Sequence, residues 1–194
     1  MSQPMSRATF LSRGASGGIA LVAGGSLLAA STGPALAATT GDADIAKLAA
    51  TAELLAIDFY SKAIASARFK GDELRYLRRA RVSERAHYKA LARVLKSDAP
   101  SGLAFMYPAG TFGSRLSIAK TGVALETAFV GAYLGAVTAL QSNELKGVAA
   151  TIAASEASHL SVFSDIAAHN PIVASFPKSL SAAQATKALA PFLS

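Results

Sequence analysis

The sequence predicts an all-α protein: a four-helix bundle of two antiparallel hairpins joined by one long crossover, followed by a short C-terminal helix. Three observations support this prediction. Alanine is abundant and aromatic residues make up only 7% of the 194 residues, which suits closely packed helices better than sheets. Apolar residues recur at helical spacing from Asp42 onward. Glycine and proline interrupt that spacing in separate places, which divides the chain into helices and connections.

Residues 1–37 are predicted to be an export signal. A basic start with Arg7 and Arg13 is followed by uncharged residues from Gly14 to Gly41, and Pro34 precedes the small-residue triplet 35–37. This order is typical of a secretory signal peptide, and we expect cleavage near Ala37. A membrane anchor is the less favoured alternative, because glycines dilute the apolar stretch. We therefore expect the mature protein in the periplasm, in the cell envelope or outside the cell.

The stretch 6–11, Ser-Arg-Ala-Thr-Phe-Leu, resembles the twin-arginine export motif of bacteria. Ala8 stands where the second arginine of that motif would be. The resemblance implies export of a folded protein, a route that is compatible with metal loading before export.

Residues 38–170 are expected to form the bundle. The predicted helices are Asp44–Arg68, Asp72–Lys96, Ser114 or Ser117 to Gln141, and Asn143–His169. Asp72 and Asn143 are the expected N-caps of the second and fourth helices. The turns within each pair are short, so each pair is expected to pack as an antiparallel hairpin.

Two irregular segments complete the prediction. Residues 97–113 contain two prolines and three glycines, so they cannot form a continuous helix and are predicted to be the crossover. The tail, residues 171–194, contains Pro177 and is predicted to form a loop and a short helix over about residues 181–189. We expect this tail to cover one end of the bundle.

Each predicted long helix carries one glutamate among apolar residues: Glu53, Glu84, Glu126 and Glu156. The second and fourth helices also place a histidine three residues later, at His87 and His159. Residues at positions i and i+3 share a helix face, so each Glu-x-x-His pair can converge on one metal ion.

The two halves of the chain repeat this pattern. Glu53 and Glu126 are separated by 73 residues, whereas the glutamates and the histidines of the two Glu-x-x-His pairs are each separated by 72. Tyr60 and Tyr133 obey the same repeat, because each follows its glutamate by seven residues, or two helical turns. The tyrosines are predicted either to donate a hydrogen bond or an electron to the site or to be ordinary core residues.

Four carboxylates buried without a cation would cost several kcal/mol each, so the pattern predicts bound metal. Two divalent ions would balance the four negative charges. The chain has no cysteine, which leaves oxygen and imidazole ligands and favours iron or manganese, with zinc and copper as open alternatives.

Across about Asp44–His169 the chain resembles the ferritin-like di-iron carboxylate superfamily, and within it the exported bacterial ferritin-like proteins. The resemblance implies two iron ions, with manganese or a mixed manganese–iron pair as alternatives. It implies the following ligands: terminal carboxylates Glu53 and Glu126, bridging carboxylates Glu84 and Glu156, and terminal imidazoles His87 and His159. It also implies reaction with O₂ or peroxide, as in a ferroxidase, an oxidase or a peroxidase, with an electron donor that the sequence does not identify.

The chain departs from the family pattern in two respects. Ser83 and Ser155 occupy positions where many di-iron oxidases carry an acidic residue. The absence of cysteine also means that the chain has no rubredoxin-like electron donor of its own. Three other functions stay open: a structural bundle that inert metal ions only stabilise, iron storage in a closed cage, and a dimanganese catalase.

The second predicted helix is strongly basic. Ten cations lie between residues 68 and 96, against three acids: Arg68, Lys70, Arg75, Arg78, Arg79, Arg81, Arg85, Lys89, Arg93 and Lys96, against Asp72, Glu73 and Glu84. This helix either contacts an anionic surface or is a solvated outer face, which is the favoured interpretation. No base-reading module is visible, so no nucleic-acid partner is expected, and the sequence is compatible with a homo-oligomer.

Overall fold

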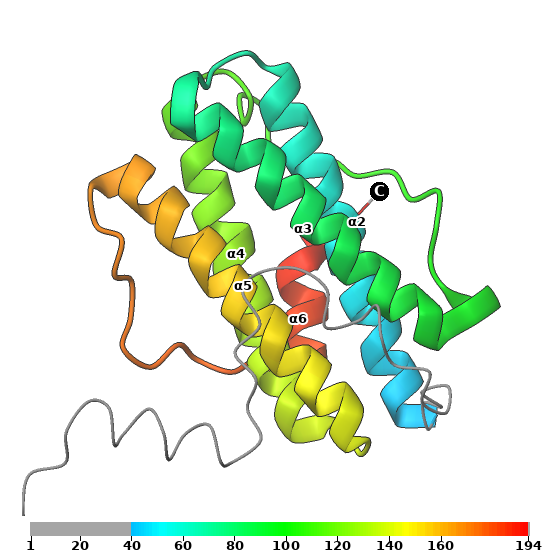
Figure 1. The fold of residues 1–194 in the computed structure, drawn as a ribbon. Helices are drawn as coiled ribbons and strands as arrows, with labels where there is room; N and C mark the ends of the chain where they lie inside the picture. The colour runs from blue at the N-terminus through cyan, green and yellow to red at the C-terminus, as the bar shows by residue number, and fades with distance from the viewer. Residues whose placement is uncertain (1–39, 194) are drawn as a thin grey trace, which may run out of the picture. The chain divides into compact units, whose positions relative to one another are not determined.

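The structure, a computed structural model, describes residues 40–193, and the predicted export segment lies outside the described residues. Four long helices dominate: α2 (Thr40–Ala65), α3 (Gly71–Leu95), α4 (Arg115–Ala139) and α5 (Asn143–Ala168). They pair as α2 with α3 and α4 with α5, with a connection of five residues in the first hairpin and three in the second (Figure 1). The predicted all-α four-helix bundle is confirmed.

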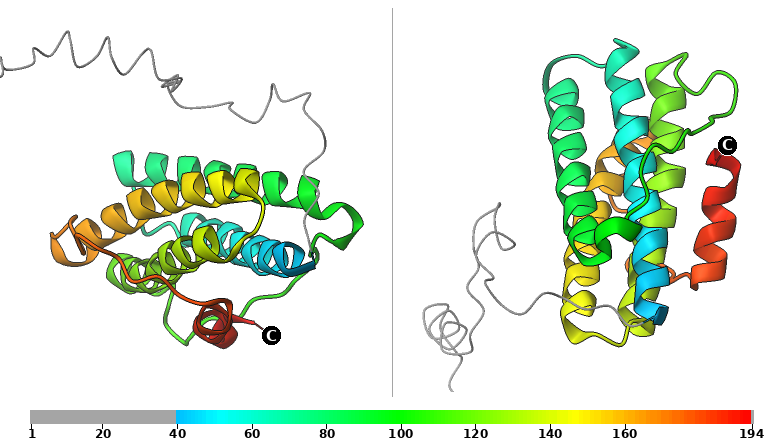
Figure 2. Two further views of the ribbon diagram at one scale, coloured as in Figure 1. Left: turned by 90° about the horizontal axis from the view of Figure 1, so that it is seen from below. Right: turned by 90° about the vertical axis from the view of Figure 1, so that its right-hand side faces the viewer.

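The short elements follow the bundle as predicted. A 3₁₀ turn, η1 (Lys96–Asp98), extends α3 into the crossover, and the tail forms α6 (Ala182–Leu189) and η2 (Ala190–Phe192). Seen from below, α3 and α5 form one layer and α2 and α4 a second layer, with α6 lying against the outer side of the second (Figure 2, left). The tail therefore packs along the side of the bundle, and the expectation that it covers an end is wrong.

Two helix starts differ from the predicted caps. Helix α3 begins at Gly71 after Lys70, which makes no side-chain cap, so Asp72 lies inside the first turn. There its negative charge favours the helix N-terminus without capping it. Helix α5 is capped by Ser142, whose hydroxyl accepts a hydrogen bond from the backbone N–H of Leu145. Asn143 is the first helical residue instead of the cap.

Two glycines of α4 account for the position of the tail. Gly131 accepts a 2.8 Å hydrogen bond from the backbone N–H of Leu180, and a Cβ on Gly135 would overlap the Leu180 carbonyl oxygen. The Gly-x-x-x-Gly spacing thus makes a groove in which backbone contacts backbone. The end of the tail is held by the crossover, because Met106 donates a 2.9 Å backbone hydrogen bond to Phe192.

The main hydrophobic core includes Phe59 and Tyr60 of α2, Leu125 and Phe129 of α4, and Phe163 of α5. Phe163 stacks on Tyr60 with ring centroids 5.7 Å apart. Helix α4 is the only described helix that is long and apolar enough to span a membrane, and its packing against α5 and α6 accounts for that apolar character as core. This packing surrounds the middle of the bundle, where the predicted ligands lie.

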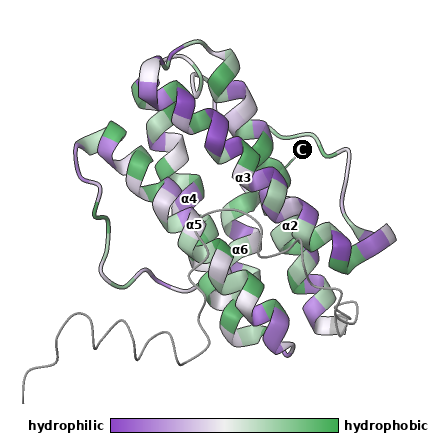
Figure 3. Cartoon of the chain, in the orientation of Figure 1, coloured by the Kyte–Doolittle hydropathy of each residue, from purple (hydrophilic) through white to green (hydrophobic). Residues whose placement is uncertain are grey.

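The outer face of α3 is a row of exposed cations, which Figure 3 shows as purple stretches along that helix. We call this row the α3 cationic ridge; its members are Arg75, Arg78, Arg79, Arg85, Lys89 and Arg93 of α3, together with Lys96 at the start of η1. Arg75 pairs with Asp72, whereas the other six have no ion pair within residues 40–193. Four of the twelve acidic residues of the chain are the buried glutamates of the bundle, so the surface is more basic than the formal charge of +7 indicates.

Candidate dinuclear metal centre

Each of the four long helices contributes one fully buried glutamate. Glu53 of α2, Glu84 of α3, Glu126 of α4 and Glu156 of α5 are exposed by 2% or less. Burial follows from their positions on the core-facing stripes of their helices. On α3, for example, Leu77 and Leu91, seven residues before and after Glu84, are buried as well. The sequence therefore forces four carboxylates into the interior wherever the bundle forms.

The six predicted ligands form two groups that share a member. The first group contains Glu53, Glu84, His87 and Glu156, and the second contains Glu84, Glu126 and His159. Within each group, one ligand atom per residue lies within 4.8 Å of the others. A carboxylate common to both groups is the arrangement that a bridged pair of metal ions needs.

The two histidines point toward the carboxylates from their own helices. Nδ1 of His87 lies 3.1 Å from Glu156 Oε1, 3.2 Å from Glu84 Oε2 and 3.4 Å from Glu53 Oε2. Nε2 of His159 lies 3.4 Å from Glu84 Oε1. The two groups are thus unequal, because one imidazole contacts three carboxylates and the other contacts one.

Five buried carboxylate oxygens accept no hydrogen bond of good geometry from the described residues, although three of them, Glu53 Oε2, Glu84 Oε1 and Glu156 Oε1, lie within 3.4 Å of a histidine nitrogen. They are Oε2 of Glu53, Oε1 of Glu84, Oε2 of Glu126 and both oxygens of Glu156. A buried acceptor without a donor costs about 1–3 kcal/mol, and more when it is charged. The set of oxygen and imidazole donors suits iron or manganese, and bound cations would satisfy all five oxygens. The residues present therefore fit a pair of divalent metal ions.

Without metal, burial favours the protonated form of three of the four carboxyl groups. Burial, together with the neighbouring carboxylates, raises the pKa of Glu84 and that of Glu156 well above the ordinary value. Burial also raises the pKa of Glu126 to about 7, although the hydrogen bond from Tyr60 acts in the opposite direction. Metal ions binding here must displace protons, which makes metal affinity dependent on pH.

The histidines shift in opposite directions. Burial lowers the pKa of His87, but hydrogen bonds to Glu156, Glu53 and Glu84 outweigh it and raise the pKa to about 12. Burial and the charge of His87 lower the pKa of His159 to about 4. In the metal-free protein His87 is therefore the cation of the cluster, and His159 is neutral.

The two predicted tyrosines connect the hairpins, because each donates a hydrogen bond to a glutamate of the other hairpin. Tyr60 of α2 donates a 2.6 Å hydrogen bond to Oε1 of Glu126, and Tyr133 of α4 donates one to Oε1 of Glu53. Both rings are buried, which raises the pKa of each phenol well above its ordinary value. Each tyrosine therefore remains a donor that holds one oxygen of a glutamate of the other hairpin.

The serines beside the motif glutamates contact the histidines. Ser83 Oγ lies 3.3 Å from Nε2 of His87, and Ser155 Oγ lies 3.3 Å from Nε2 of His159. The two hydroxyls are also 3.3 Å from each other, which places them where the two halves of the repeat meet. Neutral hydroxyls thus take the positions where many di-iron oxidases have an acid.

Sequence reasoning missed one residue at the site, Tyr76 of α3. Its hydroxyl lies 3.2 Å from Nδ1 of His159, and its ring is 5.9 Å from that imidazole. The repeat could not reveal it, because the position 72 residues later is Val148. The one signal in the sequence was its position eight residues before Glu84, which places Tyr76 on the side of α3 that faces the site.

A helical bundle with one buried glutamate per helix and two Glu-x-x-His pairs defines the class of carboxylate-bundle metal proteins. The comparison with protein families agrees: the model of the ferritin-like domain matches residues 41–169, and the chain belongs to that family. No curated protein matches the chain.

Proposed function

We propose that this protein binds two iron ions in the carboxylate cluster and that the loaded protein reacts with O₂ or peroxide as a ferroxidase or oxidase. The observation that carries the proposal is the cluster of four buried glutamates and two histidines, in which Glu126 Oε2 and Glu156 Oε2 have neither a hydrogen bond nor a histidine within ion-pair distance among the described residues. A purely structural bundle gains nothing from these oxygens, since each one destabilises the metal-free fold. Selection of a site that is costly when empty is typical of function at that site.

Each of the two ligand groups would hold one of the two ions. Glu53 and His87 would hold one ion, Glu126 and His159 would hold the other, and Glu84 would lie between them. Glu156 belongs to the first group and completes the charge balance, because four carboxylates offset two divalent ions. A bound iron pair supplies the two electrons that reduction of O₂ to peroxide requires, one from each ion.

The remaining residues keep the ligands in place. The hydroxyls of Tyr60 and Tyr133 hold one oxygen of Glu126 and of Glu53, so the second oxygen of each faces the cluster. Tyr76 holds the second ring nitrogen of His159, and such a contact fixes the orientation of an imidazole ligand. The apolar packing of Phe163 against Tyr60 keeps water from this side of the site.

The proposal includes export. It is supported by the order of charged, apolar and small residues in the segment 1–37, and by the absence of cysteine, which leaves no thiol to oxidise outside the cytoplasm. N-terminal sequencing of the protein from the culture medium or periplasm should give a chain beginning near Ala38. A full-length chain in the cytoplasm would contradict export without affecting the metal site.

The proposed reaction is tested by metal analysis of the mature protein and an anaerobic Fe²⁺ titration followed by a pulse of O₂ or of peroxide. We expect about two iron ions per chain and new absorbance between about 300 and 700 nm after the pulse. Glu84→Ala and His159→Ala should abolish that absorbance, whereas Glu144→Ala, which removes an exposed acid of α5, should leave it unchanged.

Two results would contradict the proposal. Binding of less than one metal ion per chain would exclude the dinuclear site. Two bound ions that are inert to both oxidants would favour a metal-stapled bundle, which would then melt at a higher temperature with metal than without it.

A further inference from the structure

The two imidazoles of the candidate metal centre are turned in opposite ways. His87 directs Nδ1 at the carboxylates, at 3.1–3.4 Å, and its Nε2 lies 3.3 Å from the hydroxyl of Ser83. His159 directs Nε2 at Oε1 of Glu84, 3.4 Å away, and its Nδ1 lies 3.2 Å from the hydroxyl of Tyr76. The repeated Glu-x-x-His sequence therefore does not give the two histidines the same orientation.

The packing around His159 accounts for its orientation. The rings of Tyr76 and Tyr60 each have a centroid 5.9 Å from that of the imidazole, and the side chain of His159 is buried. A turn of the imidazole would displace one of these rings. With the imidazole in this position, the hydroxyl of Tyr76 is the polar partner of Nδ1, and Nε2 faces the second ligand group.

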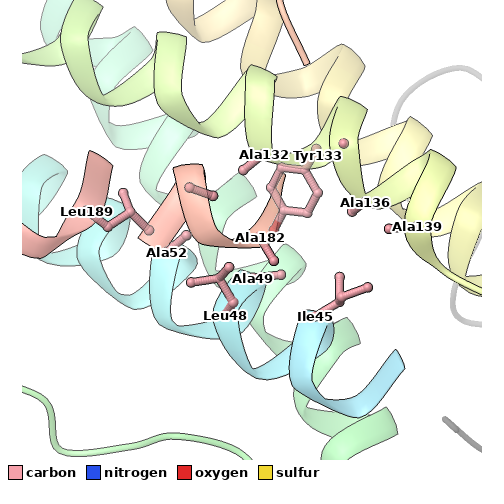
Figure 4. Close-up of a pocket in the computed structure, with 12 residues that line it drawn as sticks. Ile45, Leu48, Ala49, Ala52, Ala132, Tyr133, Ala136, Ala139, Ala182 and Leu189 are labelled. Atoms are coloured by element: carbon pink, nitrogen blue, oxygen red, sulfur yellow. The ribbon is translucent and has the colours of Figure 1, made fainter. Parts of the chain in front are cut away.

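No such hydroxyl lies beside His87 at the corresponding position. In the repeat the counterpart of Tyr76 is Val148 of α5, whose side chain has no polar group. The ring of Tyr133 lies among small side chains of α2, α4 and α6, as Figure 4 shows, and its hydroxyl donates to the carboxylate of Glu53 instead of an imidazole. The two halves of the repeat thus differ at the position that orients an imidazole.

The position of the ring proton follows from this geometry. A neutral imidazole that binds an ion through one nitrogen carries its proton on the other, and that N–H needs an acceptor when it is buried. If Nε2 of His159 binds the ion, the hydroxyl oxygen of Tyr76 accepts from Nδ1–H. The hydroxyl of Ser155 lies 3.3 Å from the same Nε2 and also 3.3 Å from the hydroxyl of Ser83, so it keeps a partner when Nε2 binds an ion.

We propose that Tyr76 makes Nε2 the ligand nitrogen of His159, whereas His87 binds its ion through Nδ1. Tyr76 is then a positioning residue, and the two ions of the pair are held through different ring nitrogens although the two motifs have the same sequence. The inference rests on the proposed function, because it needs a bound ion at each of the two ligand groups.

The ligand nitrogens are tested with Zn²⁺, which is diamagnetic and binds carboxylate and imidazole ligands. The chain has three histidines, and the exposed His169 serves as an unbound reference. In ¹H–¹⁵N correlation spectra of the zinc-loaded protein, the ring proton of His159 should lie on Nδ1 and that of His87 on Nε2. Protons on the same ring nitrogen in both histidines overturn the proposal.

The role of Tyr76 is tested by removing its hydroxyl. Tyr76→Phe should weaken the binding of one of the two Zn²⁺ ions about 10–100-fold in isothermal titration calorimetry and leave the other near its wild-type affinity, because one ligand group does not include His159. Tyr88→Phe is the matched control, since Tyr88 lies on the same helix and donates to the carbonyl of Pro100; both ions should keep their affinity. Wild-type affinity for both ions in Tyr76→Phe, or equal losses in the two variants, overturns the proposal. If Tyr76→Phe does not fold, the spectra of the wild-type protein decide alone.

The outcomes separate this inference from the function on which it rests. A protein that binds two ions and is inert to O₂ and peroxide refutes the proposed reaction, and opposite ring protons in the two histidines then still support the inference. A protein that reacts with an oxidant and uses the same ring nitrogen in both histidines keeps the proposed function and refutes the inference alone. Less than one bound ion per chain overturns both.

Discussion

Raising the pH above 6.5 should destabilise the metal-free protein. His87 has a pKa of about 12 in the folded state and about 6.5 when unfolded, so the folded state binds more protons between these values, and stability falls as pH rises. From pH 6.5 to 8 this amounts to roughly 2 kcal/mol, at about 1.4 kcal/mol for each pH unit over which one proton is released. The raised pKa values of Glu84 and Glu156 act in the same direction.

The pH range from 6.5 to 8 is chosen because His159, whose titration acts in the opposite direction, contributes little there. The lowered pKa of His159, about 4, makes stability rise with pH only up to its ordinary value of about 6.5. Above that pH the loss from His87 is the larger effect. In the metal-loaded protein the sign reverses, because fewer protons compete with the ions as the pH rises.

Urea unfolding at pH 6.5, 7.2 and 8, with and without bound metal, measures both slopes. The His87→Gln variant has no titrating imidazole at this position, so the stability of its metal-free form should fall less steeply between pH 6.5 and 8 than that of the wild type. Metal-free stability that is constant or increases from pH 6.5 to 8 would refute the reasoning, since it would mean that the buried cluster holds no extra protons in the folded state.

Three further predictions follow. Tyr133→Phe leaves a buried carboxylate oxygen without its donor, so the metal-free protein should lose about 1–3 kcal/mol in urea unfolding; an unchanged midpoint would argue against the hydrogen bond. Gly135→Val should expel the tail, because its side chain overlaps the Leu180 carbonyl, and limited proteolysis should then cut near that residue faster than in the wild type; equal cleavage rates would contradict this packing. The α3 cationic ridge, as a solvated face, should not sediment with anionic lipid vesicles at physiological ionic strength; sedimentation that Arg79→Glu/Arg85→Glu weakens would instead indicate that the ridge contacts an anionic surface, at about 1 kcal/mol per cation.

The bundle and the ligand set could be predicted because both follow from repeated local patterns. The spacing of apolar residues predicts which side of each helix faces the core. A glutamate on that side is easily recognised in the sequence, as Glu84 is between Leu77 and Leu91. The caps were less predictable, because neighbouring residues compete for one role. Ser142 and Asn143 are both good N-caps, and the course of the turn after α4 decides between them.

The path of the tail could not be predicted because it depends on contacts distant in sequence. Gly131 and Gly135 look like ordinary small core residues until Leu180, more than forty residues later, lies against them. The turn between α4 and α5 is similar, since its two backbone N–H groups at Gln141 and Ser142 donate to Asp42 at the start of α2. Neither contact leaves a periodic signal in the chain.

The same reasoning explains why the repeat revealed the ligands but not the difference between their surroundings. A repeat reports what the two halves share, and both halves share a Ser-Glu-x-x-His sequence on the site. The halves differ at Tyr76, whose counterpart is Val148, and that one difference gives His159 a hydroxyl partner on Nδ1. His87 lacks such a partner and instead directs its own Nδ1 at three carboxylates. The carboxylates raise the pKa of His87, whereas burial and the charge of His87 lower that of His159, so the two ions of a bound pair would meet imidazoles with different surroundings.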